Sequence, residues 1–178
     1  MTSRRELILT AAADLIATRG YHEVGIDEIG ETAGISGPGV YRHFAGKTAL
    51  LEALCDRAMG TLETGAAQAG TLEELVEQHV RFAVDERQLI AVYYREQRAL
   101  TDDVRRTQRG RQRAYEALWR DVTAPLRPDL SPAEVLLVVV AALAVLNATA
   151  LSHVDVPAER QRALLRETAT AVLLGPHH

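Results

Sequence analysis

Residues 26–47 read IDEIGETAGISGPGVYRHFAGK, and this stretch decides the fold. Its apolar residues recur at helical spacing on either side of a glycine-containing break, which predicts two short helices over about 26–33 and 38–44. Gly34-Ile35-Ser36 forms the expected turn between them. Two short helices joined by a tight turn make a helix-turn-helix.

Individual residues in this stretch suit a helix-turn-helix. Gly30 is small enough for the two helices to cross closely, and Gly34 accepts the left-handed conformation expected in the turn. Ser36 is expected to cap the second helix, and Pro38 in the first helical turn costs no hydrogen bond. The apolar contacts expected to lock the pair come from Ile29, Ile35, Val40 and Phe44.

The same helical periodicity extends through the flanking segments. A first helix over about 3–18, ended by Gly20, is predicted to carry one apolar stripe. The stripe comprises Leu7, Ile8, Ala11, Ala12, Leu15 and Ile16. A longer helix over about 47–64 follows the motif, and the small, polar segment 65–70 is the predicted domain boundary.

The C-terminal part is also predicted to be helical throughout. Its expected helices cover about 71–84, 86–99, 102–122, 132–152 and 157–174. Three helix starts have the hydroxyl and carboxylate spacing of a capping box, at Ser3 with Glu6, Thr71 with Glu74, and Ser131 with Glu134. The sequence therefore predicts an all-α protein of about nine helices, with a three-helix N-terminal domain over 1–64 and a second helical domain over 65–178.

Composition argues against an enzyme, a secreted protein and a membrane protein. One cysteine among 178 residues excludes an internal disulfide, and no His-Glu-x-x-His or phosphate-loop pattern is present. We therefore expect no catalytic residues, no metal site and no cofactor. The sequence starts without a signal-peptide pattern, and its longest apolar run, 135–146, is too short to span a bilayer. A cytoplasmic location is the expectation.

Net charge does not by itself indicate a nucleic-acid binder. The chain carries −4, and residues 1–54 hold five bases against seven acids. A strongly basic domain is the usual electrostatic signature of nucleic-acid binding. Any such binding must therefore depend on where individual side chains stand.

The end of the motif carries a family resemblance. Residues 41–47, Tyr-Arg-His-Phe-Ala-Gly-Lys, match the Tyr-x-His-Phe-x-x-Lys ending of the TetR family, and Gly34, Ile35, Ser36, Val40 and Leu50 also fall in place. The chain thus resembles TetR-type regulators over roughly residues 4–63. The resemblance implies a ligand-responsive transcriptional regulator, in most members a repressor, that binds double-stranded operator DNA. Val24-Gly25 replaces the threonines usual at the start of the second helix, which weakens that cap.

The resemblance implies a role in DNA binding for each matching residue. Tyr41 and His43 would donate hydrogen bonds to phosphate oxygens, and Lys47 would hold a further phosphate. Base edges would be met by Gly37, Pro38 and Arg42, at the start of a helix capped by Ser36. Because this reading face is sparse, DNA shape should contribute much of the specificity, with Arg4 or Arg5 near flanking phosphate or the minor groove.

The resemblance also implies that the last two helices form a homodimer interface. Residues 135–146 are apolar on all sides of a helix, so this helix needs cover from two directions. A two-fold dimer would place two reading helices one DNA turn apart, on a palindromic operator. Complete burial within a monomer is the alternative.

A small-molecule effector is expected in the C-terminal part. Apolar residues with a few polar atoms are the candidates to line its site: Met59, Leu62, Phe82, Tyr93, Tyr94, Arg98, Trp119 and Asn147. Residues 95–120 hold eight arginines against four acids, which indicates either a solvated helix face or an anionic effector such as an acyl-CoA. Asn147 would bind the effector or set the register of the dimer. The alternative function is a non-catalytic helical interaction protein that binds no DNA.

Overall fold

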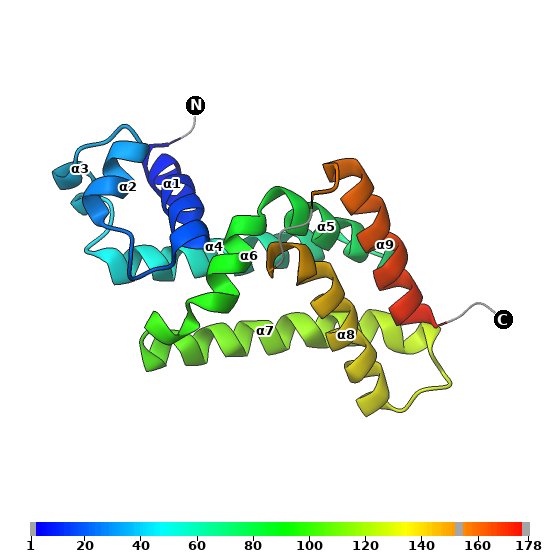
Figure 1. Ribbon diagram of the computed structural model, residues 1–178. Coiled ribbons are helices and arrows are strands. Elements are labelled where there is room, and N and C mark those ends of the chain that lie inside the picture. The colour runs from blue at the N-terminus through cyan, green and yellow to red at the C-terminus, as the bar shows by residue number, and fades with distance from the viewer. Residues whose placement is uncertain (1–2, 152–154, 176–178) are drawn as a thin grey trace. The chain divides into compact units, whose positions relative to one another are not determined.

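The computed structural model describes residues 3–151 and 155–175, and within them it contains nine α-helices and no strand. Figure 1 shows these helices, which are α1 (Arg4–Arg19), α2 (Ile26–Thr32), α3 (Gly37–Tyr41), α4 (Lys47–Gln68), α5 (Leu72–Asp85), α6 (Arg87–Arg95), α7 (Asp102–Thr123), α8 (Pro132–Leu151) and α9 (Ala158–Leu174). Two short 3-10 helices, η1 (Gln97–Ala99) and η2 (Ala124–Leu126), complete the set. The predicted all-α fold is confirmed.

The helices form two compact units. The first comprises Met1–Ala58 and Gln88–Gln108, and the second comprises Met59–Arg87 and Arg109–His178. Helices α4 and α7 contribute residues to both units. The functional boundary expected between residues 64 and 65 stays a prediction.

Helix ends follow the capping signals in the sequence. The Ser3 hydroxyl accepts from the backbone N–H of Glu6 at 3.2 Å, and Gly20 ends α1 with φ at 90°. Thr71 and Glu74 form a complete capping box at α5. At α8, Ser131 and Glu134 exchange the same reciprocal bonds. Local signals therefore determine where these helices begin.

Two sequence expectations about helices in the first unit were wrong. Leu7 is 42% exposed, and the buried face of α1 includes Leu9 instead, because the helix turns its Ile8 and Ile16 side toward the core. The helix expected over 86–99 is interrupted after Arg95, where α6 gives way to η1.

Helix α4 continues beyond its expected end at residue 64. It runs to Gln68, and Gly65 lies within it. A Cβ at Gly65 would lie 3.3 Å from the Cβ of Gln78 on α5, so the small residue permits close packing of the two helices. Buried Ala66 adds an apolar contact in the same turn.

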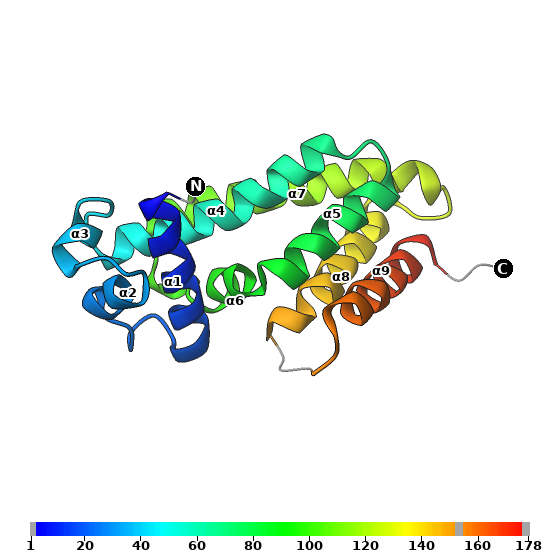
Figure 2. The same ribbon diagram turned by 90° about the horizontal axis from the view of Figure 1, so that it is seen from above.

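The second unit is held together around α5, α8 and α9, which lie side by side in Figures 1 and 2. Its largest fully buried side chain is Trp119 of α7. Arg162 of α9 donates to Asp85 at 2.5 Å, and Arg166 donates to Glu77 at 2.7 Å, so two ion pairs join α9 to α5. In the part of the chain that the structure describes, no helix is long and apolar enough to cross a membrane.

Candidate nucleic-acid interface and effector-binding core

The helix-turn-helix has the geometry expected from its glycines. Gly34 has φ at 67°, the left-handed conformation that the turn requires. The backbone N–H of Ile35 donates to the carbonyl of Gly30 at 2.8 Å, and a Cβ at Gly30 would lie 2.6 Å from the carbonyl oxygen of Ile35. Only glycine therefore fits where the turn passes over α2.

The outer face of α3 presents most of the predicted DNA contacts to solvent. Pro38, Tyr41, Arg42 and His43 are exposed, Tyr41 at 56%, although tyrosine usually buries much of its ring. Gly37 is half-buried, and a Cβ there would overlap the carboxylate of Asp27. The sparse surface of this face is therefore a consequence of tight packing against α2.

The expected hydroxyl cap on α3 was wrong. Ser36 occupies the N-cap position with an extended backbone and stands exposed, but its side chain makes no capping hydrogen bond. Gly25 begins α2 without a side-chain cap, as expected from the loss of a threonine there. Both short helices are thus held mainly by the packing of Ile29, Val40 and Phe44, which are buried.

Lys47 is only partly available to a phosphate. Its Nζ donates to the carbonyl of His22 at 3.3 Å and lies 4.4 Å from the centre of the Tyr21 ring. The Tyr21 hydroxyl is 3.3 Å from Oγ1 of Thr48. The side chain therefore ties the start of α4 to the turn between α1 and α2, a role that the sequence motif did not reveal.

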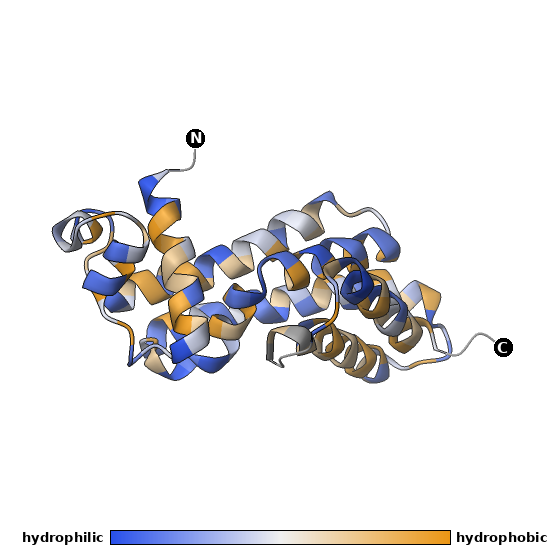
Figure 3. Ribbon diagram, turned by 45° about the horizontal axis from the view of Figure 1, so that its top comes forward, coloured by the Kyte–Doolittle hydropathy of each residue, from blue (hydrophilic) through white to orange (hydrophobic). Residues whose placement is uncertain are grey.

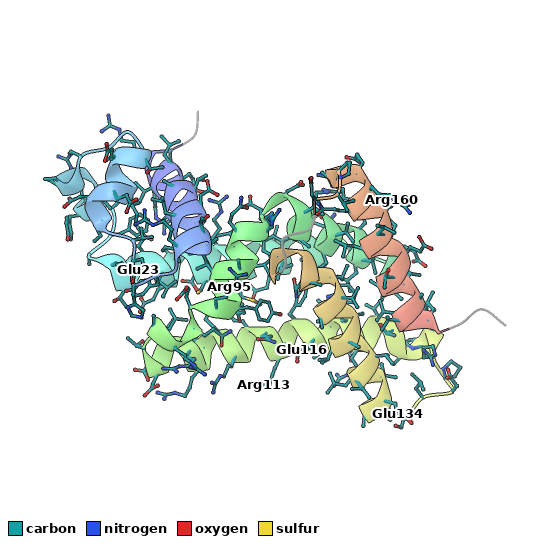
Figure 4. All side chains as sticks on the ribbon, viewed as in Figure 1. Glu23, Arg95, Arg113, Glu116, Glu134 and Arg160 are labelled. Atoms are coloured by element: carbon teal, nitrogen blue, oxygen red, sulfur yellow. The ribbon has the colours of Figure 1, made fainter. Side chains whose placement is uncertain are left out.

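The end of α6 and the residue after it are bonded to the end of α1 and to the turn that follows α1. The carboxylate of Glu96 accepts from the backbone N–H of Tyr21 at 3.2 Å, and Arg95, labelled in Figure 4, donates to the carbonyl of Ala17 at 3.3 Å. Both partners lie more than 70 positions earlier in the chain. This connection places the end of α6 beside the end of α1 and the turn before α2.

The two N-terminal arginines expected near DNA differ in their surroundings. Both are exposed, but the guanidinium of Arg5 also lies 5.1 Å from the centre of the Phe44 ring. A cation over an aromatic face is held there by the ring quadrupole. Arg5 therefore also stabilises the end of the helix-turn-helix.

The predicted effector-binding residues divide between the two units. Met59, Phe82, Trp119 and Asn147 are buried in the second unit, which also contains half-buried Leu62. In the first unit, Tyr93 is buried, while Tyr94 and Arg98 are exposed. The structure brings Phe82, Trp119 and Asn147 together around one histidine of α5.

That histidine, His79, is buried and was missed by the sequence analysis. Its Nδ1 lies 3.0 Å from the Tyr115 hydroxyl and its Nε2 lies 3.1 Å from Oδ1 of Asn147. Its ring also meets Phe82 and Trp119 edge to face. Burial lowers the pKa of His79 to about 4, so the ring is neutral at neutral pH. The only sequence signal was its position on the apolar face of α5.

Asn147 therefore points into the interior of the second unit. It is 6% exposed, and its carbonyl oxygen is directed to His79. A residue that set the register between two copies would present its amide on an outer face. The alternative role of Asn147 in dimer register is not supported by this orientation.

The arginines of 95–120 are largely matched by acids or open to solvent. Arg111 makes a bidentate pair with Glu63 at 2.8 and 2.6 Å, and this hydrogen bonding lowers the pKa of Glu63. Arg113, labelled in Figure 4, is exposed on α7.

Within residues 3–151 and 155–175, no three His, Cys, Asp or Glu side chains come together to hold a metal ion.

Two family models match this chain. Residues 8–54 match the bacterial regulatory proteins of the tetR family, and residues 65–154 match the tetracyclin repressor-like C-terminal domain. The chain belongs to the TetR family. The expected resemblance is confirmed, and the matched ranges cover both the helix-turn-helix and most of the helical C-terminal part.

Known TetR-type proteins resemble this chain in sequence and in fold. The HTH-type transcriptional activator FasR of Mycolicibacterium smegmatis is 39% identical over 82 residues, which cover 46% of this chain and 37% of FasR. A TetR-family regulator from Bordetella parapertussis superposes with a TM-score of 0.84 at 22% identity, covering 97% of this chain and 95% of its own. AibR, solved with isovaleryl coenzyme A and operator DNA, superposes with a TM-score of 0.76 at 16% identity, covering 97% and 99%. These structures establish the fold.

Proposed function

We propose that this TetR-family chain is a dimeric transcriptional regulator that binds a palindromic double-stranded operator and releases it when an effector binds. The observation that carries the proposal is the exposed group of Tyr41, Arg42 and His43 at the C-terminal end of α3, a helix fixed by the glycine turn. Side chains that could donate to phosphates and bases stand outward there, while the apolar residues of the motif are buried.

The proposed DNA contacts separate positioning from sequence reading. Tyr41 and His43 donate to phosphate oxygens, and Arg42 reads a guanine in the major groove. Lys47 adds positive charge at the edge of this group, from a side chain already held by Tyr21. Ser36, Gly37 and Pro38 allow close approach of the DNA without contributing strong hydrogen bonds.

The proposed dimer interface lies on the outer face of α8 and α9. Large apolar side chains stand exposed there: Leu136, Leu137, Val140 and Leu164. The opposite face of α8, with Val135, Val139 and Leu146, is buried in the unit. Figure 3 shows that α8 is hydrophobic along most of its length. A second copy related by a two-fold axis would cover the outer face and give two reading helices.

The effector is proposed to be a hydrophobic molecule, with an acyl-CoA as the leading candidate. Support comes from the apolar core of the second unit and from AibR, which is similar in fold and was solved with isovaleryl coenzyme A. An exposed arginine of the second unit, such as Arg113, would bind the phosphates of such a ligand at the surface.

The direction of regulation is a separate part of the proposal. Most simply, operator release would derepress a gene, but the relative FasR is named an activator. A bound regulator blocks or recruits RNA polymerase, depending on where its operator lies relative to the promoter. We therefore propose effector-controlled operator occupancy, and we assign repression as its first expected outcome.

Genomic DNA fragments captured by the purified protein, then sequenced and footprinted, test this function. We expect a palindromic site, with affinity that decreases steeply as salt is raised. Arg42→Ala should weaken specific binding by about 1–3 kcal/mol at one base position in each half-site. Arg81→Ala, which changes an exposed arginine on α5 away from the proposed DNA contacts and dimer face, is the matched control and should bind as the unaltered protein does.

If the purified protein retains no DNA at low salt, the proposal that it is a transcriptional regulator is contradicted. That result would favour the alternative, a helical interaction protein without DNA binding. Equal loss of binding in Arg42→Ala and Arg81→Ala would contradict the assignment of α3 as the reading helix.

A further inference from the structure

Of the four buried side-chain polar atoms on α7 that have no hydrogen-bond partner in the described structure, two belong to the second unit and two, on Arg105 and Gln108, to the first. Those of the second unit are Nε1 of Trp119 and Oγ1 of Thr123, in side chains that are both 0% exposed. The two residues are four positions apart, so they lie on one face of the helix, one turn from each other. A buried donor without a partner costs about 1–3 kcal/mol, and native proteins retain few of them.

The neighbouring polar groups are already occupied by one another. His79 uses both ring nitrogens, one with the Tyr115 hydroxyl and one with Asn147. Because the Asn147 carbonyl accepts from Nε2–H, Nδ1 accepts from the Tyr115 hydroxyl. The ring centres of His79 and Trp119 are 5.8 Å apart, yet the indole N–H donates to none of these three side chains. The polar cluster of His79, Tyr115, Asn147, Trp119 and Thr123 therefore has unused donors only on α7.

The cluster is electrically neutral. His79 is uncharged at neutral pH because burial lowers its pKa. Among the described residues, the buried polar or charged ones are His79, Gln108, Thr123 and Asn147, so no buried lysine or arginine stands beside it. A carboxylate or phosphate placed here would lack a counter-charge, and burying an unpaired charge is far more costly than burying a neutral acceptor.

We propose that Trp119 Nε1 and Thr123 Oγ1 bind the neutral carbonyl oxygen of an otherwise apolar effector. An indole can only donate, so the ligand atom must be an acceptor, and a carbonyl oxygen has two lone pairs for two donors. Phe82 meets the His79 ring edge to face, and the second unit also buries Leu75 and Leu146, so its interior suits an apolar remainder. The inference rests on the proposed function, since it names the part of the effector that the second unit recognises.

This assignment narrows the effector to ketones, esters and thioesters. A free fatty acid is excluded from the cluster by its charge. An acyl-CoA remains compatible only with its thioester carbonyl at α7 and its phosphates outside the buried core. Thr123 allows recognition of a carbonyl to be distinguished from simple filling of apolar space. Valine in its place removes the hydroxyl and keeps the shape of the side chain.

The single tryptophan provides the test. Trp119 is the only tryptophan in the chain, so nitrogen-labelled protein gives one indole N–H resonance. The full chain is titrated with three matched probes: 2-decanone, decanoate and decane. We expect 2-decanone to move the indole resonance downfield in a saturable way, and to bind at least about tenfold more tightly than either other probe, equivalent to about 1.4 kcal/mol.

Thr123→Val removes the hydroxyl and retains the shape of the side chain. It should weaken binding of 2-decanone by about threefold to tenfold, the worth of one neutral hydrogen bond, and leave decane unchanged. Thr107→Val, an exposed threonine on the same helix, is the control and should bind all three probes as before. Circular dichroism of both variants checks that the fold is retained.

Three results would overturn the inference. Decane or decanoate binding as tightly as 2-decanone would show that no neutral carbonyl is recognised. If methyl ketones of about six to fourteen carbons leave the indole resonance unmoved, no such ketone binds at Trp119. A long-lived water on the indole N–H that 2-decanone does not displace would identify water as the missing partner. The titration needs no DNA, so it separates this inference from the proposed function. Ketone binding without operator binding would contradict only the proposed function. Operator binding without ketone binding would contradict only this inference.

Discussion

The ammonium group of Lys47 lies 4.4 Å from the centre of the Tyr21 ring, and it also donates to the carbonyl of His22. The lysine that the TetR motif places on a DNA phosphate is thus a structural tie in the first unit. The same turn receives the carboxylate of Glu96 from beyond the end of α6. The side chain proposed to bind a phosphate therefore also anchors the α1–α2 turn.

Replacing Lys47 by methionine should lower stability as well as DNA affinity. Loss of a half-buried cation over the buried Tyr21 ring costs about 0.5–2 kcal/mol, and each kcal/mol shifts Tm by about 2–4 °C at this chain length. Lys47→Arg keeps a cation and should retain most of the stability. An unchanged Tm for Lys47→Met, measured by calorimetry, would show that the contact with Tyr21 contributes nothing.

The turn of the helix-turn-helix should reject any side chain at Gly30. Gly30→Ala places a Cβ 2.6 Å from the Ile35 carbonyl, and the resulting overpacking should destabilise the fold by about 1–3 kcal/mol. Gly110→Ala is the control, because nothing lies within 4 Å of its Cβ and it is in the middle of α7. It should stabilise the protein by about 0.5–1 kcal/mol. Urea unfolding of the two variants should therefore give opposite signs.

The burial of His79 should make stability depend on pH. Its pKa is about 4 in the folded chain, below the ordinary value of 6.5, so between these values the unfolded chain holds a proton that the folded chain lacks. The free energy of unfolding should fall as pH decreases from about 6.5 to 4, by on the order of 3 kcal/mol.

His79→Gln removes the titrating group, and should make unfolding free energy less dependent on pH in that window. Exposed His22→Gln serves as the control and should leave the dependence intact. If the unfolding free energies of the unaltered protein and His79→Gln, measured with urea, change with pH in parallel, His79 is not the source of the pH dependence.

The Cys55 thiol should be unreactive in the native protein. It is 1% exposed, and burial, with the nearby charges of Asp56 and Glu52, raises its pKa to about 12. The reactive thiolate is then almost absent at neutral pH. A thiol reagent should label the chain only after unfolding in guanidinium. Fast labelling of the folded protein at neutral pH would be incompatible with this environment.

A charge on the outer face of α8 should dissociate the proposed dimer. Leu137 is 68% exposed, and Leu137→Glu would place two carboxylates near the two-fold axis of an apolar interface. Leu126→Glu changes an exposed leucine on η2 and should leave the oligomeric state unchanged. Analytical ultracentrifugation distinguishes the two. A dimer that survives Leu137→Glu at micromolar concentration would place the interface elsewhere.

Much of the fold could be predicted because its signals act within a few residues. The left-handed turn at Gly34 and the capping box of Thr71 with Glu74 depend on contacts one helical turn apart. The expected end of α4 at residue 64 failed for the opposite reason, since Gly65 remains helical by packing against Gln78, thirteen positions later. A glycine in isolation favours a break, but tertiary contact can override that preference.

The candidate DNA-reading residues were also identified from a local motif. Tyr41, Arg42 and His43 follow one another on a short exposed segment, and the structure leaves them outward. The hydroxyl cap expected from Ser36 was wrong because suitable sequence position does not fix a side-chain rotamer. Whether these residues contact DNA as proposed stays a prediction.

The sequence by itself thus determined the helices, the glycine turn and the family, since each depends on residues close together along the chain. Only the tertiary structure placed Lys47 against Tyr21, joined His79 to Asn147 across 68 positions, and left Trp119 without a partner. Such pairings depend on how whole helices pack, because burial brings distant side chains within hydrogen-bond range and removes the water that would otherwise satisfy them.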